Sequence, residues 1–386
     1  MSSKTIINPS TNTKLDKITY TSINECEIMI QNAKEAQSLW KYETLKNRSQ
    51  IIYNYRSKLI ENKQKLATLI HQENGKTLNE AIAEVDKSIE VCEFACSLPQ
   101  LCSGETQEVS RGVYCQERLE PQGVVAQITP FNFPMMVAHW TLPISICLGN
   151  AVILKPSEKV PLTMIECLKL WQEAGLPKHI LQLVHGEKEA VQTLCTHNEI
   201  KAVSFVGSTP IAKEVYKLSS QHLKPALCLG GAKNHLIALP DCNIEMTAKD
   251  VVASMSGCAG QRCMAASLLI VVGENDTLIT RLTEVASELK TGCDIGAIIN
   301  ESSQKRIEEY ITNAETQGAT IRLDGRQNRP DEGTFVGPTI LDHVTPEMPA
   351  ATDEIFGPVL SIIRVKTVEE AIQIENQSRY GNGASV

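Results

Sequence analysis

Apolar residues recur at three- and four-residue spacing from residue 23 to about residue 102, which is the period of one buried face of an α-helix. Ile51, Tyr55 and Leu59 illustrate this spacing, and Gly75 is its one clear interruption. The pattern predicts that the chain opens with a helical lead-in.

Beyond Pro121 the pattern changes to short β-rich runs separated by amphipathic stretches. The runs span residues 123–128, 151–154, 181–184 and 202–206. The stretches 161–173 and 210–220 begin with proline, which suits the first turn of a helix because its missing N–H would have no partner there. Strands that alternate with helices predict parallel βαβ units.

A second series of strands and helices begins near residue 236. Its elements are a strand over 267–272, a helix over 304–317 and a strand over 360–365. Because 386 residues exceed the size at which one hydrophobic core keeps growing, we expect two α/β domains. We place the first over residues 1–228 and the second over residues 229–386.

The composition excludes several kinds of partner. The chain has 42% apolar and 21% charged residues and a net charge of −8 without a basic block, so no nucleic-acid partner is expected. No apolar run is long enough to span a bilayer and the opening residues lack a signal or transit peptide, which favours a cytoplasmic location away from membranes. The thirteen cysteines have no paired spacing, so we expect reduced thiols and no metal site.

Two strand-to-helix junctions carry polar groups that suit a nucleotide. Lys155–Glu158 follows one predicted strand and Gly207–Pro210 follows another. Ligands bind at the carboxyl ends of parallel strands, where a helix amino terminus offers N–H groups to a phosphate. The chain has no G-x-G-x-x-G motif, so Lys155 and Glu158 are instead candidates for holding ribose hydroxyls. The alternative is that both junctions are ordinary turns.

Two further segments carry groups that suit acyl chemistry. Gly257–Ala265 places cysteines among glycines and beside Arg262, which would favour an ionised and therefore nucleophilic thiol. Two prolines in Thr129–Pro134 predict a non-helical loop that aims Asn132 outward, where its amide can donate to an oxyanion. The alternatives are that the cysteines are small buried hydrophobes and that Asn132 caps the following helix.

Six segments occur in the order and spacing of one enzyme family. They are Phe131–Pro134, Leu154–Glu158, Phe205–Ser208, Leu229–His235, Gly260–Ala265 and Glu354–Val359. They resemble the motifs of the aldehyde dehydrogenase superfamily, and within it Gly-Ala-Lys-Asn-His and Gln-Arg-Cys-Met-Ala resemble the acyl-CoA-forming branch, the methylmalonate (malonate) semialdehyde dehydrogenases. The resemblance covers nearly the whole chain. It implies an α/β fold with two Rossmann-like domains and a small β oligomerisation element near residues 106–122.

The resemblance also assigns roles to individual residues. Cys263 would attack the aldehyde carbon, while Asn132 and the Cys263 backbone N–H stabilise the oxyanion before hydride passes to NAD. Cys258 is the local rival of Cys263. The implied contacts of NAD are Thr129, Phe131, Lys155, Glu158, Lys159, Ser208, Gly230 and Glu354. For Glu354 the alternative is a structural ion pair. A glutamate near the ribose would repel a 2′-phosphate, which favours NAD over NADP.

The glycine-rich segment departs from the pattern of the hydrolytic family members. These carry a water-activating glutamate before Leu-Gly-Gly-Lys, and when Lys233 is matched to their lysine that position falls on Leu229. Without this base the resemblance implies that CoA, as co-substrate, takes the acyl group. It also implies that Arg262 and a second arginine hold a substrate carboxylate. The second position is Lys87 here, for which a solvent-facing side chain is the alternative.

The expected reaction is the oxidation of malonate or methylmalonate semialdehyde with NAD to an acyl-CoA, through a Cys263 thioester and with release of CO2. Family members continue past the position of Val386 into a strand that pairs with a neighbouring subunit. The resemblance therefore implies a shortened catalytic domain, and a homo-oligomer if that segment is present. Two rivals stay open: a hydrolytic aldehyde dehydrogenase that releases a free acid, and an inactive homologue that binds NAD.

Overall fold

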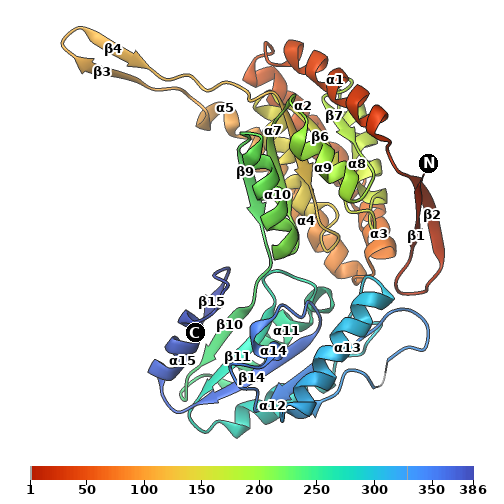
Figure 1. Cartoon of the computed structure of the whole chain (residues 1–386), viewed down its shortest axis with the longest axis vertical. Helices are drawn as coiled ribbons and strands as arrows, with labels where there is room; N and C mark the ends of the chain where they lie inside the picture. The colour runs from red at the N-terminus through yellow and green to blue at the C-terminus, as the bar shows by residue number, and fades with distance from the viewer. Residues whose placement is uncertain (1, 328) are drawn as a thin grey trace. The chain divides into compact units, whose positions relative to one another are not determined.

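The computed structural model describes residues 2–327 and 329–386, and the chain divides into two compact units (Figure 1). The first unit holds the segment that ends at Ile6 together with residues 16–70 and 81–230. The second unit holds residues 7–15, 71–80 and 231–386. It therefore includes two segments that the sequence analysis placed in the N-terminal domain.

The predicted helical lead-in is confirmed. Its helices are α1 (Ile23–Trp40), α2 (Leu45–Glu61), α3 (Lys63–Asn74), α4 (Leu78–Cys96) and α5 (Leu98–Leu101). The side chains of Ser22 and Thr44 accept hydrogen bonds from first-turn N–H groups and so cap α1 and α2. Ahead of them, β1 (Ser3–Ile7) and β2 (Lys14–Thr19) form a two-stranded sheet that was not predicted.

The predicted parallel sheet of the first unit is also confirmed. Its strands are β5 (Val124–Ile128), β6 (Ala151–Lys155), β7 (Leu181–Leu183), β8 (Ile200–Val206) and β9 (Ala226–Leu229). They lie in the order β7-β6-β5-β8-β9, and every neighbouring pair is parallel. Strand β5 comes first along the chain and lies in the centre of the sheet. Strands β6 and β7 extend the sheet on one side of β5, and β8 and β9 extend it on the other. The carboxyl ends of β5 and β8 therefore flank the switch point at which open α/β sheets bind ligands.

Short and long helices accompany this sheet. They are α6 (Met136–His139), α7 (Leu142–Cys147), α8 (Leu162–Glu173), α9 (Lys188–Thr196) and α10 (Thr209–Gln221). Helices α8 and α10 were predicted, although Pro161 lies at the N-cap of α8 and not in its first turn. Helix α9 was not predicted. Strands and helices share one core, in which Leu154 and Trp171 are fully buried.

A β-hairpin follows α5 and consists of β3 (Thr106–Ser110) and β4 (Val113–Gln116), paired antiparallel. Figure 1 shows it as an arm that extends away from α5. All of its strand residues are exposed, including Val109, Val113 and Tyr114. The predicted β element is therefore present, and its part in oligomerisation stays a prediction.

The second unit contains a sheet in the order β12-β13-β14-β11-β10-β15, parallel except between β12 and β13. The strands are β10 (Asn234–Ala238), β11 (Ala266–Val272), β12 (Thr320–Leu323), β13 (Thr339–Asp342), β14 (Val359–Val365) and β15 (Ala384–Ser385). The helices are α11 (Ile244–Ser256), the 3₁₀ turn η1 (Gly257–Gly260), α12 (Asp276–Ser287), α13 (Glu301–Thr316), α14 (Pro349–Thr352) and α15 (Val368–Asn376).

This sheet buries apolar residues on both faces. Along β11, Leu268 and Ile270 belong to one apolar cluster while Leu269 and Val271 belong to another. The predicted strands and the predicted helix of the second α/β series are present, whereas α11 and α12 were not predicted.

Within residues 2–327 and 329–386, no helix is long and apolar enough to cross a membrane. The same residues contain no group of three or more His, Cys, Asp or Glu side chains that is placed to hold a metal ion. All thirteen cysteines are free thiols; Cys258 is buried and Cys263 is partly exposed.

Candidate active site

The segment around Cys263 begins with a strained turn. Cys258, Ala259 and Gly260 have φ values of 50°, 53° and 69° in η1. Left-handed backbone is costly for residues with a Cβ, and such strain collects at functional sites. Gly260 is required by packing as well, because a Cβ there would lie 2.0 Å from the carbonyl oxygen of Gly357. The turn thereby brings the Cys263 segment against the last of the six motifs.

Two asparagine side chains hold the backbone beside Cys263. The Nδ2 of Asn234 donates to the carbonyl oxygens of Cys263 and Ala265 over 2.8 and 2.9 Å. The Nδ2 of Asn382 donates to the same Cys263 oxygen over 3.0 Å. Asn234 is buried, and its Oδ1 has no hydrogen-bond partner in the described part of the chain. These bonds restrict the peptide that follows the thiol. Neither asparagine was predicted to have a role, although Asn234 lies inside the motif Leu229–His235.

The electrostatic surroundings of the Cys263 thiol differ from the expectation. Burial raises its pKa above the ordinary value, nearby backbone N–H groups lower it, and the Glu354 carboxylate raises it further, so the net shift is upward. Arg262, which was expected to favour the thiolate, contacts Cys258 instead. Arg262 thus contacts the thiol of the local rival, Cys258, and is not among the groups that shift the pKa of Cys263. Cys263 remains the better candidate nucleophile, since Cys258 is buried.

Arg262 lies between the turn and the amino terminus of α4. Its Nη2 is 3.6 Å from the Oε1 of Glu80, and a Cβ on Gly257 would come within 2.4 Å of its guanidinium carbon. Burial lowers the pKa of Arg262, but its contacts with Cys258 and Glu80 raise it, with a net increase. Its Nε has no partner among the described residues. Glu80 was missed, although Thr77 and Glu80 have the spacing of a helix-capping box.

Glu354, assigned to the cofactor, is held within the second unit by the backbone N–H of Ala232 at 3.1 Å. Burial raises the pKa of its carboxyl, against opposing effects of that N–H, Arg306 and Lys233. Lys233 is fully buried and donates to the carbonyl oxygen of Ala350 over 2.8 Å. Burial lowers the pKa of Lys233 to about 7, although nearby carboxylates oppose this shift.

The residues expected to hold adenosine lie at the carboxyl end of β6. Lys155 is buried, and its Nζ donates to the carbonyl oxygens of Pro156 and Gly186 over 3.0 and 2.9 Å. The same Nζ lies 3.9 Å from Glu158. Burial lowers the pKa of Lys155, although carboxylates beside it oppose the shift. The structure therefore brings Lys155 and Glu158 together, as expected for a pair that would hold ribose hydroxyls.

The loop after β5 supplies two more of the expected contacts. The hydroxyl oxygen of Thr129 is buried without a partner among the described residues, which leaves it available to a ligand. The Nζ of Lys159 lies over the ring of Phe131, 4.8 Å from its centroid. The loop is non-helical, as predicted. Asn132, however, is only 6% exposed, so the prediction that it faces outward is wrong.

Asn132 does not cap the following helix, because the N-cap of α6 is Met135 and makes no side-chain capping bond. Ser208 is the N-cap of α10 and is exposed, and its hydroxyl makes no capping bond either. At Gly230 a Cβ would lie 3.0 Å from the hydroxyl oxygen of Thr209, so this backbone passes close to the start of α10. A helix start with an unengaged hydroxyl and a close glycine backbone suits a phosphate group.

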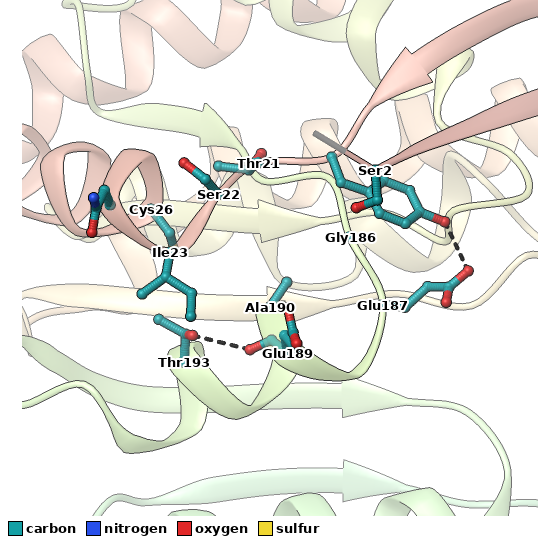
Figure 2. A pocket seen from close by; sticks show the side chains of 12 residues that line it. Ser2, Thr21, Ser22, Ile23, Cys26, Gly186, Glu187, Glu189, Ala190 and Thr193 are labelled. Atoms are coloured by element: carbon teal, nitrogen blue, oxygen red, sulfur yellow. Dashed lines mark hydrogen bonds between the residues drawn. The ribbon is translucent and has the colours of Figure 1, made fainter.

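A cavity of about 390 Å³ lies in the first unit, near Lys155 and Glu158. Its lining residues are Ser2, Tyr20, Thr21, Ser22, Ile23, Asn24, Cys26, Gly186, Glu187, Glu189, Ala190 and Thr193. The hydroxyl of Tyr20 donates to the Oε1 of Glu187 over 2.7 Å, and Figure 2 shows Glu187 and Gly186 among the residues that line the cavity. The carbonyl oxygen of Gly186 joins this cavity to Lys155.

Two of the sequence-based expectations concern the substrate. Lys87 lies on an exposed part of α4, where its side chain is 62% exposed and its Nζ pairs with Glu90 over 2.8 Å. The structure thus gives Lys87 a surface ion pair. Segment 228–233 contains no carboxylate: Leu229 ends β9 and is exposed, and burial raises the pKa of the Cys228 thiol to about 11.

Comparisons with known proteins agree with this arrangement of motifs. The sequence model of the aldehyde dehydrogenase family matches residues 2–386. A malonate-semialdehyde dehydrogenase of Bacillus velezensis is 42% identical over 98% of this chain and 80% of its own length. Malonate-semialdehyde dehydrogenase 2 of Geobacillus kaustophilus is 41% identical with the same coverage.

Solved structures show the same likeness in three dimensions. The methylmalonate-semialdehyde dehydrogenase of Oceanimonas doudoroffii superposes with a TM-score of 0.97 at 39% identity, over 99% of this chain and 81% of that one. A Sinorhizobium meliloti protein complexed with NAD gives a TM-score of 0.97 at 37% identity, over 99% and 80%. This chain, with its two α/β units and its Cys263 turn, belongs to the aldehyde dehydrogenase family.

Proposed function

We propose that this chain oxidises an aldehyde that carries a carboxylate, with NAD as hydride acceptor, and passes the acyl group from Cys263 to CoA. The observation that carries the proposal is the partly exposed Cys263 thiol together with a segment 228–233 that offers no carboxylate to activate water. The names of the similar proteins support malonate or methylmalonate semialdehyde as substrate, with release of CO2.

In the proposed reaction the Cys263 thiolate adds to the aldehyde carbon. The resulting oxyanion accepts hydrogen bonds from the Cys263 N–H and from the amide of Asn132. The bonds from Asn234 and Asn382 to the Cys263 carbonyl restrain the peptide between Cys263 and Met264, and so hold the backbone that carries the thiol. Cys258 takes no part.

The described residues fit NAD, whose bound nicotinamide supplies the hydride acceptor. Lys155 and Glu158 would hold the adenosine ribose, and the unpartnered Thr129 hydroxyl offers a further contact. Phe131 follows β5 and Lys159 follows β6, and the two side chains contact each other. In the proposal Ser208 and Gly230 approach the pyrophosphate, and Glu354 holds the second ribose. A carboxylate at Glu158 favours NAD over its 2′-phosphorylated form.

Arg262 is the proposed ligand of the substrate carboxylate. Its side chain is 35% exposed, and its Nε has no partner among the described residues, so donors remain for a planar carboxylate. Lys87 is not proposed as a second ligand of the substrate carboxylate, because its side chain is exposed and paired with Glu90. Lys87→Ala is therefore expected to change KM for the semialdehyde less than twofold.

The test is NADH formation from malonate semialdehyde by the purified chain, with and without CoA, and with Cys263→Ala as control. Sustained turnover that requires both CoA and Cys263 supports the acylating reaction, and acetyl-CoA and CO2 are its expected products. Turnover without CoA that yields a free acid would establish the hydrolytic rival. A folded chain that binds NAD but forms no NADH would overturn the enzymatic function and leave an inactive NAD-binding homologue.

A further inference from the structure

The carboxylate of Glu80 is placed by local structure and not by Arg262. Helix α4 starts at Leu78, and Glu80 is its third residue. The Oε2 of Glu80 accepts hydrogen bonds from the N–H and the hydroxyl of Thr77 over 2.9 and 3.0 Å, while the Glu80 N–H donates back to that hydroxyl. These are the reciprocal bonds of a capping box, and they fix the direction of the carboxylate.

The other oxygen of Glu80 contacts two residues of the segment that leads to Cys263. Its Oε1 accepts a hydrogen bond from the backbone N–H of Cys258, the first of the left-handed residues in η1. It also lies 3.6 Å from the Nη2 of Arg262. One carboxylate therefore contacts both the strained turn and the guanidinium that directly precedes Cys263.

A fixed negative charge at this distance has two opposing effects on a bound carboxylate. It keeps Arg262 in one position, and it repels any second carboxylate that approaches the same guanidinium. Glu80 is only 17% exposed, so solvent weakens this repulsion less than it would at the surface.

We propose that Glu80 is a specificity-determining residue, which limits the affinity of Arg262 for the substrate carboxylate while it holds the guanidinium and the η1 turn in place. This inference rests on the proposed role of Arg262. Glu80 touches Arg262 and the backbone of the turn, and acts on the substrate through them.

The experiment compares kcat/KM for malonate semialdehyde with kcat/KM for propanal, in which a methyl group replaces the carboxylate. Glu80→Gln keeps the shape and an acceptor oxygen but removes the charge. We expect the ratio of the two values to rise about tenfold, mostly through a lower KM for the semialdehyde. If Glu80→Gln yields too little folded protein, Glu80→Met removes the same charge and carries the same expectation.

The matched control is Glu25→Gln. Glu25 forms the same capping box with Ser22 at the start of α1, so the substitution makes the same chemical change in the same motif. Its ratio should stay within twofold of the unsubstituted chain. A merely structural effect of Glu80→Gln would change both substrates in parallel and leave the ratio unmoved, and this result would overturn the proposal.

Arg262→Met supplies the second control. In that background Glu80→Gln should change the ratio less than twofold, because no guanidinium is left for Glu80 to influence. An equal rise in both backgrounds would overturn the proposal. Failure of the proposed function looks different: the unsubstituted chain would show no preference for the semialdehyde over propanal, and Arg262→Met would not change that preference.

Discussion

The Cys263 thiol is buried in part and lies in the field of Glu354, and both raise its pKa. Glu354→Gln removes the charge and retains an oxygen that can accept from the Ala232 N–H. The pKa of Cys263 should therefore fall, since a carboxylate disfavours a nearby thiolate. The measurement is the pH dependence of alkylation by iodoacetamide, quantified on the Cys263 peptide by mass spectrometry.

The partly exposed thiol of Cys102 serves as an internal control for that experiment, because no described contact joins it to Glu354. Its alkylation profile should be the same in both proteins. An unchanged or raised midpoint at Cys263 would contradict the assigned influence of Glu354.

Asn234 and Asn382 allow a comparison of a buried and an exposed donor on one carbonyl. Asn234→Ala removes two bonds and leaves the Cys263 and Ala265 oxygens with fewer donors, so we expect a loss of about 1–3 kcal/mol in the free energy of unfolding. Asn382→Ala removes a bond to the Cys263 oxygen and one to the Met264 sulfur, both at an exposed side chain where water can replace them, and should cost clearly less. Urea unfolding measures both, and equal losses would contradict the role given to burial.

For individual residues, the sequence predicted candidate positions but not the contacts that their side chains make. The motifs gave Cys263, Lys155 and Glu158 as candidates because residue type and order carry the resemblance. They gave no direction for side chains, so Arg262 was expected at the reactive thiol and lies beside Cys258 and Glu80 instead. The contact between Glu80 and Cys258 joins positions 178 residues apart, and no local pattern specifies such a pair.

At the scale of elements, the apolar runs predicted the parallel strands because a strand covered on both faces needs apolar residues throughout. All five residues of β5 and of β6 are buried. Two of the missed elements have weak signals because they are short: α9 has nine residues, and β15 has two. Their existence depends on the sheet edges and cores against which they pack, which the local pattern does not contain.

Strand β13 ends in a buried ion network that makes a testable contribution to stability. Asp342 accepts hydrogen bonds from Arg322 over 3.0 Å and from Arg364 over 3.0 and 2.7 Å. Burial raises the pKa of Asp342, but the hydrogen bonds from the two arginines lower it by more. The net result is a pKa of about 2, compared with an ordinary value of 3.8. Asp342→Asn leaves Arg322 without this carboxylate and leaves Arg364 paired only with the exposed Asp276, so we expect a loss of about 1–3 kcal/mol at neutral pH.

The sign of the pH dependence follows from the lowered pKa. The carboxylate stabilises the folded state above its unfolded pKa, and this contribution is lost as the pH falls from about 4 to about 2. The difference in unfolding free energy between the unsubstituted chain and Asp342→Asn should therefore shrink over that window. Urea titrations at pH 7, 4 and 3 measure it, and a constant difference would show that the charge of Asp342 is not responsible.

At the scale of the whole molecule, each unit is built from segments that are distant in the sequence. In the second unit the Thr334 N–H donates to the Pro9 carbonyl over 2.8 Å, and the Ala297 N–H donates to the Gly75 carbonyl over 2.8 Å. A single boundary near residue 228 describes most of the division but omits these two segments. The pattern of apolar and polar residues shows where a series of strands begins along the chain. It does not show which earlier segment packs against those strands.

Gly75 tests whether these returning segments stabilise the second unit. It has a φ of 87°, and a Cβ there would lie 2.6 Å from Pro9 and 3.0 Å from Ala297. Gly75→Ala should therefore combine the cost of a left-handed alanine, about 1–2 kcal/mol, with that of forcing apart the two contacts. Gly318→Ala is the matched control, because Gly318 has a φ of 103° in the same unit but open space around it.

Hydrogen exchange at β11 and β14 measures the effect, since both strands lie in the sheet of the second unit. The loss of protection should be larger for Gly75→Ala than for Gly318→Ala. Equal losses in the two variants would mean that the segment around residue 75 adds no packing energy beyond its own backbone conformation.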